Sequence, residues 1–372
     1  MINIYYLPII FSSTSWIKFF GIWLVDVLYL ILLTPNIRIV LKNKWSRQFV
    51  ISYVILGFSF LLSVVINQIS NIQAYSFLLA YLYVLFPTFI NNFSLFASFL
   101  RKLIYFLNFG TFFSLFLYLL FGSSVLFSTD HMRPTFLFDN PNQLAIHLAL
   151  IFYLYSIISL KFNHVLFLFT LSSIFLTGSD GVFLIFLISF ISRLSNLKSL
   201  KLISIFIFLL FLTLSFVDFR FNVFDSIRSL DFIRLLGHSR IIQYQSFMEW
   251  FNSDLITLLF GLGSMNFANY VSSINPSSGE FHSHSLFITI FAEYGIIFGL
   301  LFVFYFFSLF IYIAITTRSP IFFSNIYPFF IFFFLSSFIH QSFRFRILYI
   351  IIGFLIISPR IIAYHRNLSY EK

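Results

Sequence analysis

The chain has 372 residues, of which 60% are hydrophobic, 23% are aromatic and only 9% are charged, whereas roughly 25% of the residues in an ordinary soluble domain are charged. So little polar surface cannot cover a water-facing globule, which excludes a soluble protein and indicates that lipid surrounds most of the chain. The sequence has no cysteine, which excludes disulfides, thiolate metal sites and cysteine nucleophiles.

Apolar runs bounded by charged or turn residues predict eleven membrane-spanning helices, since a helix needs about 20 apolar residues to cross a bilayer. The predicted spans are 16–34, 49–66, 75–90, 103–127, 143–160, 162–178, 180–192, 202–217, 285–312, 320–340 and 347–358. Residues 1–34 could instead form two short spans, which allows a total of twelve. The predicted fold class is all-α, a polytopic integral membrane protein with 11–12 transmembrane helices and one large periplasmic loop.

The basic residues predict how these spans are oriented. With every second connection in the cytoplasm, 14 of the 22 lysines and arginines fall on the inside, as the positive-inside rule requires. The run 162–192 is interpreted as two short spans joined at Gly178-Ser179-Asp180-Gly181. A single long helix would invert the orientation of every later span and break the pattern of charges.

One outer connection, residues 218–284, is 67 residues long and carries six of the twelve acidic residues. A connection of this length in a compact protein usually has a function of its own. Within it Ile241, Tyr244, Met248 and Phe251 recur at helical spacing, which predicts a helix that lies on the membrane surface. The chain therefore divides into N-terminal membrane helices at 1–217, this loop at 218–284 and C-terminal membrane helices at 285–372.

All seven basic residues of the predicted outer connections are arginines, whereas seven of the eight lysines are predicted inside. A guanidinium binds phosphate or carboxylate through two parallel hydrogen bonds and stays charged at any usable pH. The outer arginines therefore predict an anionic ligand, although any one of them could instead pair with a loop acid or a lipid headgroup. Arg344 and Arg346 lie in a six-residue connection that holds them at or just above membrane depth.

His282 and His284 directly precede the span that begins near Ser285, at the outer membrane boundary. Because its unperturbed pKa is about 6.5, a histidine at this boundary can take a proton from a sugar hydroxyl near neutral pH. No carboxylates lie at metal-ligand spacing around the two histidines, so no metal site is predicted. Glu293 and Asp26 lie within predicted spans and are expected to face protein or water and to pair there, because an ionised carboxylate is costly in lipid.

The sequence also lacks the glycine-rich and histidine motifs of nucleotide hydrolases, dinucleotide-binding proteins and common metalloproteases. Nothing in it indicates a nucleic-acid partner.

Three stretches resemble the O-antigen polymerase and ligase superfamily. One contains, in order, His238-Ser239-Arg240, Tyr244, Trp250, Gly261-Leu262-Gly263, His282-Ser283-His284 and Phe291-Ala292-Glu293-Tyr294-Gly295. The other two are Arg133-Pro134 with the segment from Phe138 to Ala145, and Leu176-Thr177-Gly178-Ser179-Asp180-Gly181. The resemblance covers residues about 130–300. It departs from the family pattern at Ser285, where the family often has Asn, and at Asp180, where it often has Arg.

The resemblance implies a metal-independent glycosyltransferase, without a cofactor, that acts at the periplasmic face of the bacterial inner (plasma) membrane. Its donor and acceptor would be glycans linked to undecaprenyl diphosphate. Its other partners would be membrane lipid and a chain-length regulator and flippase of the same pathway. The implied catalytic residues are His284 as the base and Arg240 on the donor diphosphate, and the implied substrate-binding residues are Arg133, His282, Glu293, Arg344 and Arg346.

Three functions remain open on the sequence. The chain could be a polymerase that joins repeat units, a ligase of the same superfamily that transfers glycan to a lipid A core or a protein, or a transporter or flippase. The scarcity of ionisable residues within the predicted spans and the absence of paired halves disfavour transport. The short length and the abundance of Phe and Ile, residues that an AT-rich gene encodes often, are similar to those of polymerases from polysaccharide gene clusters. This similarity favours the first function.

Overall fold

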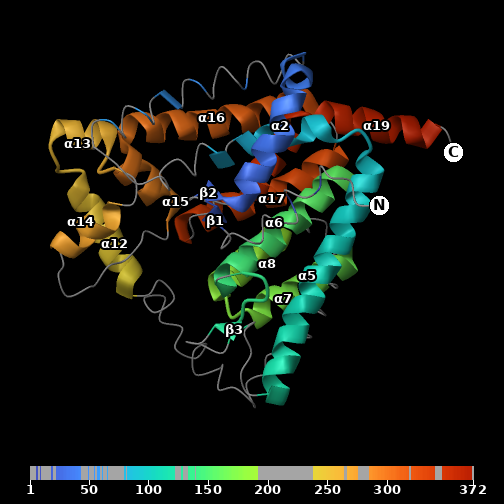
Figure 1. Cartoon of the computed structure of the whole chain (residues 1–372), viewed down its shortest axis with the longest axis horizontal. Coiled ribbons are helices and arrows are strands. Elements are labelled where there is room, and N and C mark those ends of the chain that lie inside the picture. Colours follow the sequence, from blue (N-terminus) through green and yellow to red (C-terminus); the bar gives the residue numbers. More distant parts are fainter. Residues whose placement is uncertain are drawn as a thin grey trace.

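The computed structural model describes residues 22–42, 82–121, 133–138, 140–191, 238–263, 266–274, 285–317, 320–339 and 346–370, together with short stretches and single residues elsewhere. Helices make up 87% of the described residues, so the fold is mostly helical, as predicted (Figure 1). The predicted spans at 49–66 and 202–217 lie mainly or wholly outside the described residues.

The described helices follow the predicted apolar runs. The first part of the chain contains α2 (Leu24–Lys42), the 3₁₀ helix η3 (Leu82–Phe89), α5 (Phe93–Phe121), α6 (Pro141–Ser159), α7 (His164–Leu176) and α8 (Asp180–Ile191). The later part contains α12 (His238–Trp250), α13 (Leu255–Phe260), α14 (Phe267–Ile274), α15 (Leu286–Ile288), the π-helix η6 (Thr289–Glu293), α16 (Tyr294–Thr317), α17 (Pro320–Ile339), α18 (Arg346–Ile356) and α19 (Ser358–Tyr370).

Two small antiparallel ladders are additions to the predicted all-α fold. Strand β1 (Lys18–Phe19) pairs with β2 (Ile22–Trp23), and β3 (Phe127–Ser128) pairs with β4 (Arg133–Pro134). Strands of two residues leave no periodic pattern in a sequence, which is why the apolar runs could not indicate them.

Two described helices, Phe93–Tyr118 and Pro141–Ser159, are long and apolar enough to cross a membrane. A third span results if Arg346–Ile356 and Ser358–Asn367, which are bent by 64° against each other, form one broken helix. Five shorter apolar helices accompany them, at 26–36, 164–176, 180–191, 289–305 and 324–337. The described residues thus provide two or three candidate spans of a helical membrane protein.

The predicted hairpin at 162–192 is confirmed. The ring of Phe167, near the start of α7, stacks on that of Phe190, near the end of α8, with centroids 3.9 Å apart. At the other end of the pair, Phe175 lies 5.5 Å from Phe183. The two helices therefore run antiparallel, joined by the turn at Thr177, Gly178 and Ser179.

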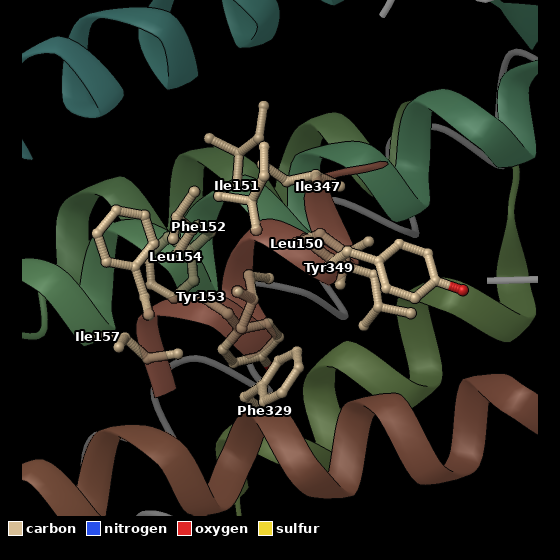
Figure 2. Packing of buried hydrophobic residues seen from close by; sticks show 14 of the residues in the cluster. Leu150, Ile151, Phe152, Tyr153, Leu154, Ile157, Phe329, Ile347 and Tyr349 are labelled. Atoms are coloured by element: carbon tan, nitrogen blue, oxygen red, sulfur yellow. The ribbon is translucent and has the colours of Figure 1, made fainter. Parts of the chain in front are cut away.

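Helix α6 lies at the centre of the main hydrophobic core. It is apolar around its whole circumference, and it packs against α5, α7, α8, α17 and α18. Figure 2 shows Tyr153 of α6 beside Phe329 of α17, with ring centroids 6.0 Å apart, and Tyr349 of α18 belongs to the same cluster. The membrane helices from the two ends of the chain consequently share one core.

The amphipathic helix α19 lies against the ends of two other helices. The Tyr364 hydroxyl donates to Asn92 Oδ1 at 3.0 Å, and His365 Nε2 lies 2.8 Å from the Ile158 carbonyl oxygen. Helix α19 thereby joins the start of α5 to the end of α6.

A buried ion pair links α2 to α18. Arg346 donates from Nε to Asp26 Oδ1 at 3.1 Å and from Nη2 to Oδ2 at 2.6 Å. The Tyr83 hydroxyl also donates to Asp26 Oδ1 at 3.1 Å, and the Tyr83 ring stacks on Tyr29 with centroids 4.1 Å apart. Asp26 is 1% exposed and Arg346 is 6% exposed. The prediction that Asp26 faces protein and pairs there is confirmed, and the pair ties together residues 320 positions apart.

Replacing Asp26 by Ala leaves the buried Arg346 guanidinium without its carboxylate, which should lower the free energy of unfolding by about 3–5 kcal/mol. The double variant Asp26→Leu, Arg346→Met removes both charges and should be nearly neutral, because neither charge then remains buried alone. Unfolding in detergent, followed by circular dichroism, measures both effects. A double variant as unstable as the single one would contradict the mutual dependence of the two residues.

Candidate functional site

The helix that follows the large loop is broken near its start. Helix α15 passes into the π-helix η6, and Gly295 then has a φ of 86°, outside the helical region. The turn Gly261-Leu262-Gly263 fills this break: the Leu262 amide donates to the Ala292 carbonyl at 2.8 Å and the Gly263 amide to the Glu293 carbonyl at 3.0 Å. The loop thus satisfies two carbonyl groups that the broken helix would otherwise leave without partners.

Glycine is required on both sides of this junction. A Cβ at Gly261 would lie 2.4 Å from the Glu293 carbonyl oxygen, and a Cβ at Gly295 would lie 2.2 Å from that of Leu259. Both glycines also have a positive φ, a backbone conformation that residues with a side chain rarely adopt. The family-like Gly-Leu-Gly and Tyr-Gly segments therefore have a local structural cause, which is the close approach of two backbones.

Helices α12, α13 and α14, here called the outer unit (residues 238–274), dock on the same broken helix. Their small hydrophobic core contains Trp250, Phe267 and Val271 of the outer unit together with Ile288 and Ala292 of the helix. The predicted helix that begins near Arg240 is confirmed as α12. The outer unit is therefore held to the helix by apolar packing as well as by the backbone hydrogen bonds.

Glu293 lies within this junction. It is 3% exposed, so its carboxyl group faces protein, as expected for an acid in a membrane segment. Its backbone carbonyl accepts the amide of Gly263, so the same residue also contributes to the attachment of the outer unit.

A second polar centre surrounds Arg133, where β4 meets the α7–α8 turn. Arg133 donates from Nε to the Thr177 carbonyl at 2.6 Å and from Nη2 to Asn142 Oδ1 at 2.8 Å. Asn142 lies in the first turn of α6, where Asn140 caps the helix and Pro141 occupies the first position. Gly178, with a φ of 62°, lets the guanidinium lie against the turn, because a Cβ there would be 2.9 Å from Arg133 Nε.

Among the described residues, no carboxylate lies within ion-pair distance of the Arg133 guanidinium. Within the described part of the chain, Asp26–Arg346 is the one ion pair. Burial lowers the pKa of the half-buried Arg133 guanidinium, and the charge of Asp180, at the start of α8, opposes that shift. Because Nε and Nη2 share one edge of the planar guanidinium, the two neutral acceptors occupy that edge and leave the Nη1/Nη2 edge for a ligand. This arrangement suits a phosphate or carboxylate bound by two parallel hydrogen bonds.

Helix α17 connects the two centres. It packs against α8, which begins at Asp180, and against α15. At the start of α15, the Ser285 hydroxyl donates to the Ser337 carbonyl of α17 at 3.3 Å. Ser285 is thus bonded to the same helix that packs against α8.

The predicted site residues have different outcomes. Arg133 and Glu293 lie in the two centres described above, whereas Arg346 donates its side edge to Asp26 in the interior. Arg240 lies in the first turn of α12, but its side chain is outside the description. His282, His284 and Arg344 lie outside the described residues.

Asn142, Thr177 and Gly178 were not predicted as site residues. The signal for them was present in the family-like segments, because Asn140-Pro141-Asn142 is a typical helix start and Gly178 marks a turn. That both segments meet at one arginine does not follow from their residue patterns.

Neither the comparison with protein-family models nor the comparison with curated proteins finds a match for this chain.

Gly295→Ala should loosen the outer unit. The substitution introduces a Cβ 2.2 Å from the Leu259 carbonyl at a φ of 86°, and backbone strain of this kind costs about 1–3 kcal/mol. Hydrogen exchange should then become faster at the Leu262 and Gly263 amides. The matched control is Gly57→Ala, where a Cβ meets nothing within 4 Å. Unchanged protection of both amides in Gly295→Ala would show that the junction does not hold the turn.

Proposed function

We propose that this chain is a multi-pass inner-membrane glycosyltransferase that polymerises polyprenyl-diphosphate-linked oligosaccharide repeat units at the periplasmic face. The proposal includes the finer topology of 11–12 spans, with the outer unit and the Arg133 turn on the periplasmic side. It rests on the apolar composition, the resemblance over residues about 130–300, and the two polar centres.

The observation that carries the proposal is the Arg133 guanidinium. Its side edge donates to two neutral oxygens, so the Nη1/Nη2 edge is the one that would bind an anion. A diphosphate leaving group gains negative charge in the transition state, and a fixed guanidinium stabilises this charge better than a mobile one. Arg240, at the start of α12, would contribute the second positive charge. Arg344 would assist from its short connection.

The reaction follows from these roles. The acceptor hydroxyl attacks the anomeric carbon of the donor glycan, a new glycosidic bond forms, and the bond from that carbon to the diphosphate breaks. His284 takes the hydroxyl proton, and the arginines bind the polyprenyl diphosphate as it leaves. His282 and Glu293 would position the sugar near the broken helix. No metal or cofactor is needed for this balance of charge and protons.

Arg133→Lys tests the donor site. An ammonium group cannot form two hydrogen bonds to the turn and still present a planar edge to a diphosphate, so transfer should fall by about 10²–10³-fold, as for the loss of one transition-state donor. Polymer formation from purified lipid-linked repeat units measures this effect. The matched control is Arg101→Lys, an exposed arginine of α5. Polymer of normal length and yield from a stably folded Arg133→Lys protein would refute this role.

The same assay tests the base and the metal-free chemistry. His284→Ala should reduce transfer by about 10²–10⁴-fold, the usual range for general-base catalysis, and EDTA should leave the wild-type rate unchanged. Near-normal turnover of His284→Ala would remove the base assignment, and abolition by EDTA would remove the metal-independent mechanism.

A further inference from the structure

The outer unit carries an exposed row of large apolar side chains. Met248, Phe251, Leu255 and Ile256 span the end of α12 and the start of α13 and are 64%, 45%, 68% and 60% exposed. These four residues are called the apolar ridge below. A row of large apolar side chains with such high exposed fractions usually marks a surface that binds a partner or a membrane.

Helix α12 carries polar and apolar side chains on both its buried and its exposed side: Trp250 is buried and Gln245 and Glu249 are exposed, but two polar residues are also buried. Gln243 and Ser246 are buried, at 1% and 2% exposure, whereas Met248 and Phe251 point outward. An amphipathic helix in water buries its apolar side chains and exposes its polar ones. The outward positions of Met248 and Phe251 therefore depart from the pattern expected of a segment that faces water only.

The ridge belongs to a unit that packs on an apolar helix with exposed apolar side chains. Helix α13 packs against α16 at the left end of α16 in Figure 1. Helix α16 exposes Leu300 and Phe304 and is apolar along its length. Continuity with this face selects a lipid bilayer as the partner of the ridge, rather than a separate apolar ligand.

Polar residues surround the ridge. Gln245, Glu249, Asn252 and Asp254 are exposed, and Asp254 also caps α13 by accepting the amides of Ile256 and Thr257 at 3.0 Å. Apolar side chains flanked by a charged and polar rim are typical of segments that lie at the level of the lipid headgroups, not of segments that cross the membrane.

We propose that the apolar ridge inserts into the leaflet on the side of the outer unit, with its polar rim at headgroup depth. The insertion fixes the height of the outer unit relative to the membrane. Because α12 begins next to Arg240, the ridge also sets the distance of that residue from the headgroup plane. The proposal concerns lipid contact only and does not depend on the glycosyl-transfer reaction.

The absence of cysteine makes the test direct, since single cysteines at Leu255 and Ile256 can carry a nitroxide spin label on the intact chain. The matched rim controls are Gln245→Cys and Glu249→Cys. Each labelled protein is placed in nanodiscs of phosphatidylethanolamine and phosphatidylglycerol. Collision with oxygen, which partitions into lipid, is compared with collision with an aqueous nickel chelate.

The ratio of the oxygen collision rate to the nickel collision rate should be at least several-fold higher for labels on the ridge than for labels on the rim. A ridge as open to nickel as the rim would mean that it faces water and would overturn the proposal. Ridge labels shielded from both reagents would also overturn it, because a protein segment or a second copy would then cover the ridge. Leu255→Ser with Ile256→Ser should raise nickel collision at a label on Met248, while Gln245→Ser should not.

Discussion

Lipid offers no hydrogen bonds, so a helix in a membrane can be interrupted only where protein satisfies the freed backbone groups. The rest of the site depends on how this chain meets that constraint at Gly295. The amides of Leu262 and Gly263 donate to the carbonyls of Ala292 and Glu293, so the docked outer unit satisfies the backbone at the break. Docking and the break therefore form one structure, which ties the outer unit to Glu293.

The structure distinguishes two uses of arginine. Arg346 gives its side edge to the carboxylate of Asp26 in the interior, which neutralises the charge and ties α2 to α18. Arg133 gives the same edge to a backbone carbonyl and an amide oxygen, which hold the group without neutralising it. The first arrangement stabilises a fold, whereas the second keeps a positive charge ready for an anionic ligand. On this ground Arg133 is the stronger of the two as a donor-binding residue.

Sequence reasoning predicted the features that depend on local pattern. The α7–α8 hairpin, the helix α12, and the burial of Asp26 and Glu293 followed from periodicity, charge and the cost of acids in lipid. Contacts between residues far apart in the sequence could not be predicted in this way. Residue spacing shows which side chains share one face of a helix, but it does not show which other helix that face contacts. The pairing of Asp26 with Arg346 and the meeting of Arg133 with the α7–α8 turn are both of this kind.

Two local features were also missed for physical reasons. The segment Leu82–Phe89 contains Pro87 and forms a 3₁₀ helix within an apolar run, where hydrophobicity alone indicates only a span. The tail after residue 358 forms α19, whose Ile361 and Tyr364 pack against the main hydrophobic core, although its composition is as polar as that of a connection.

The most direct test of the account is a structure determined by electron cryo-microscopy of the chain in nanodiscs with undecaprenyl diphosphate. The account predicts density for the diphosphate within hydrogen-bonding distance of the Nη1/Nη2 edge of Arg133, while Thr177 and Asn142 keep the other edge. A diphosphate bound elsewhere, with Arg133 paired to a carboxylate of the chain, would contradict it.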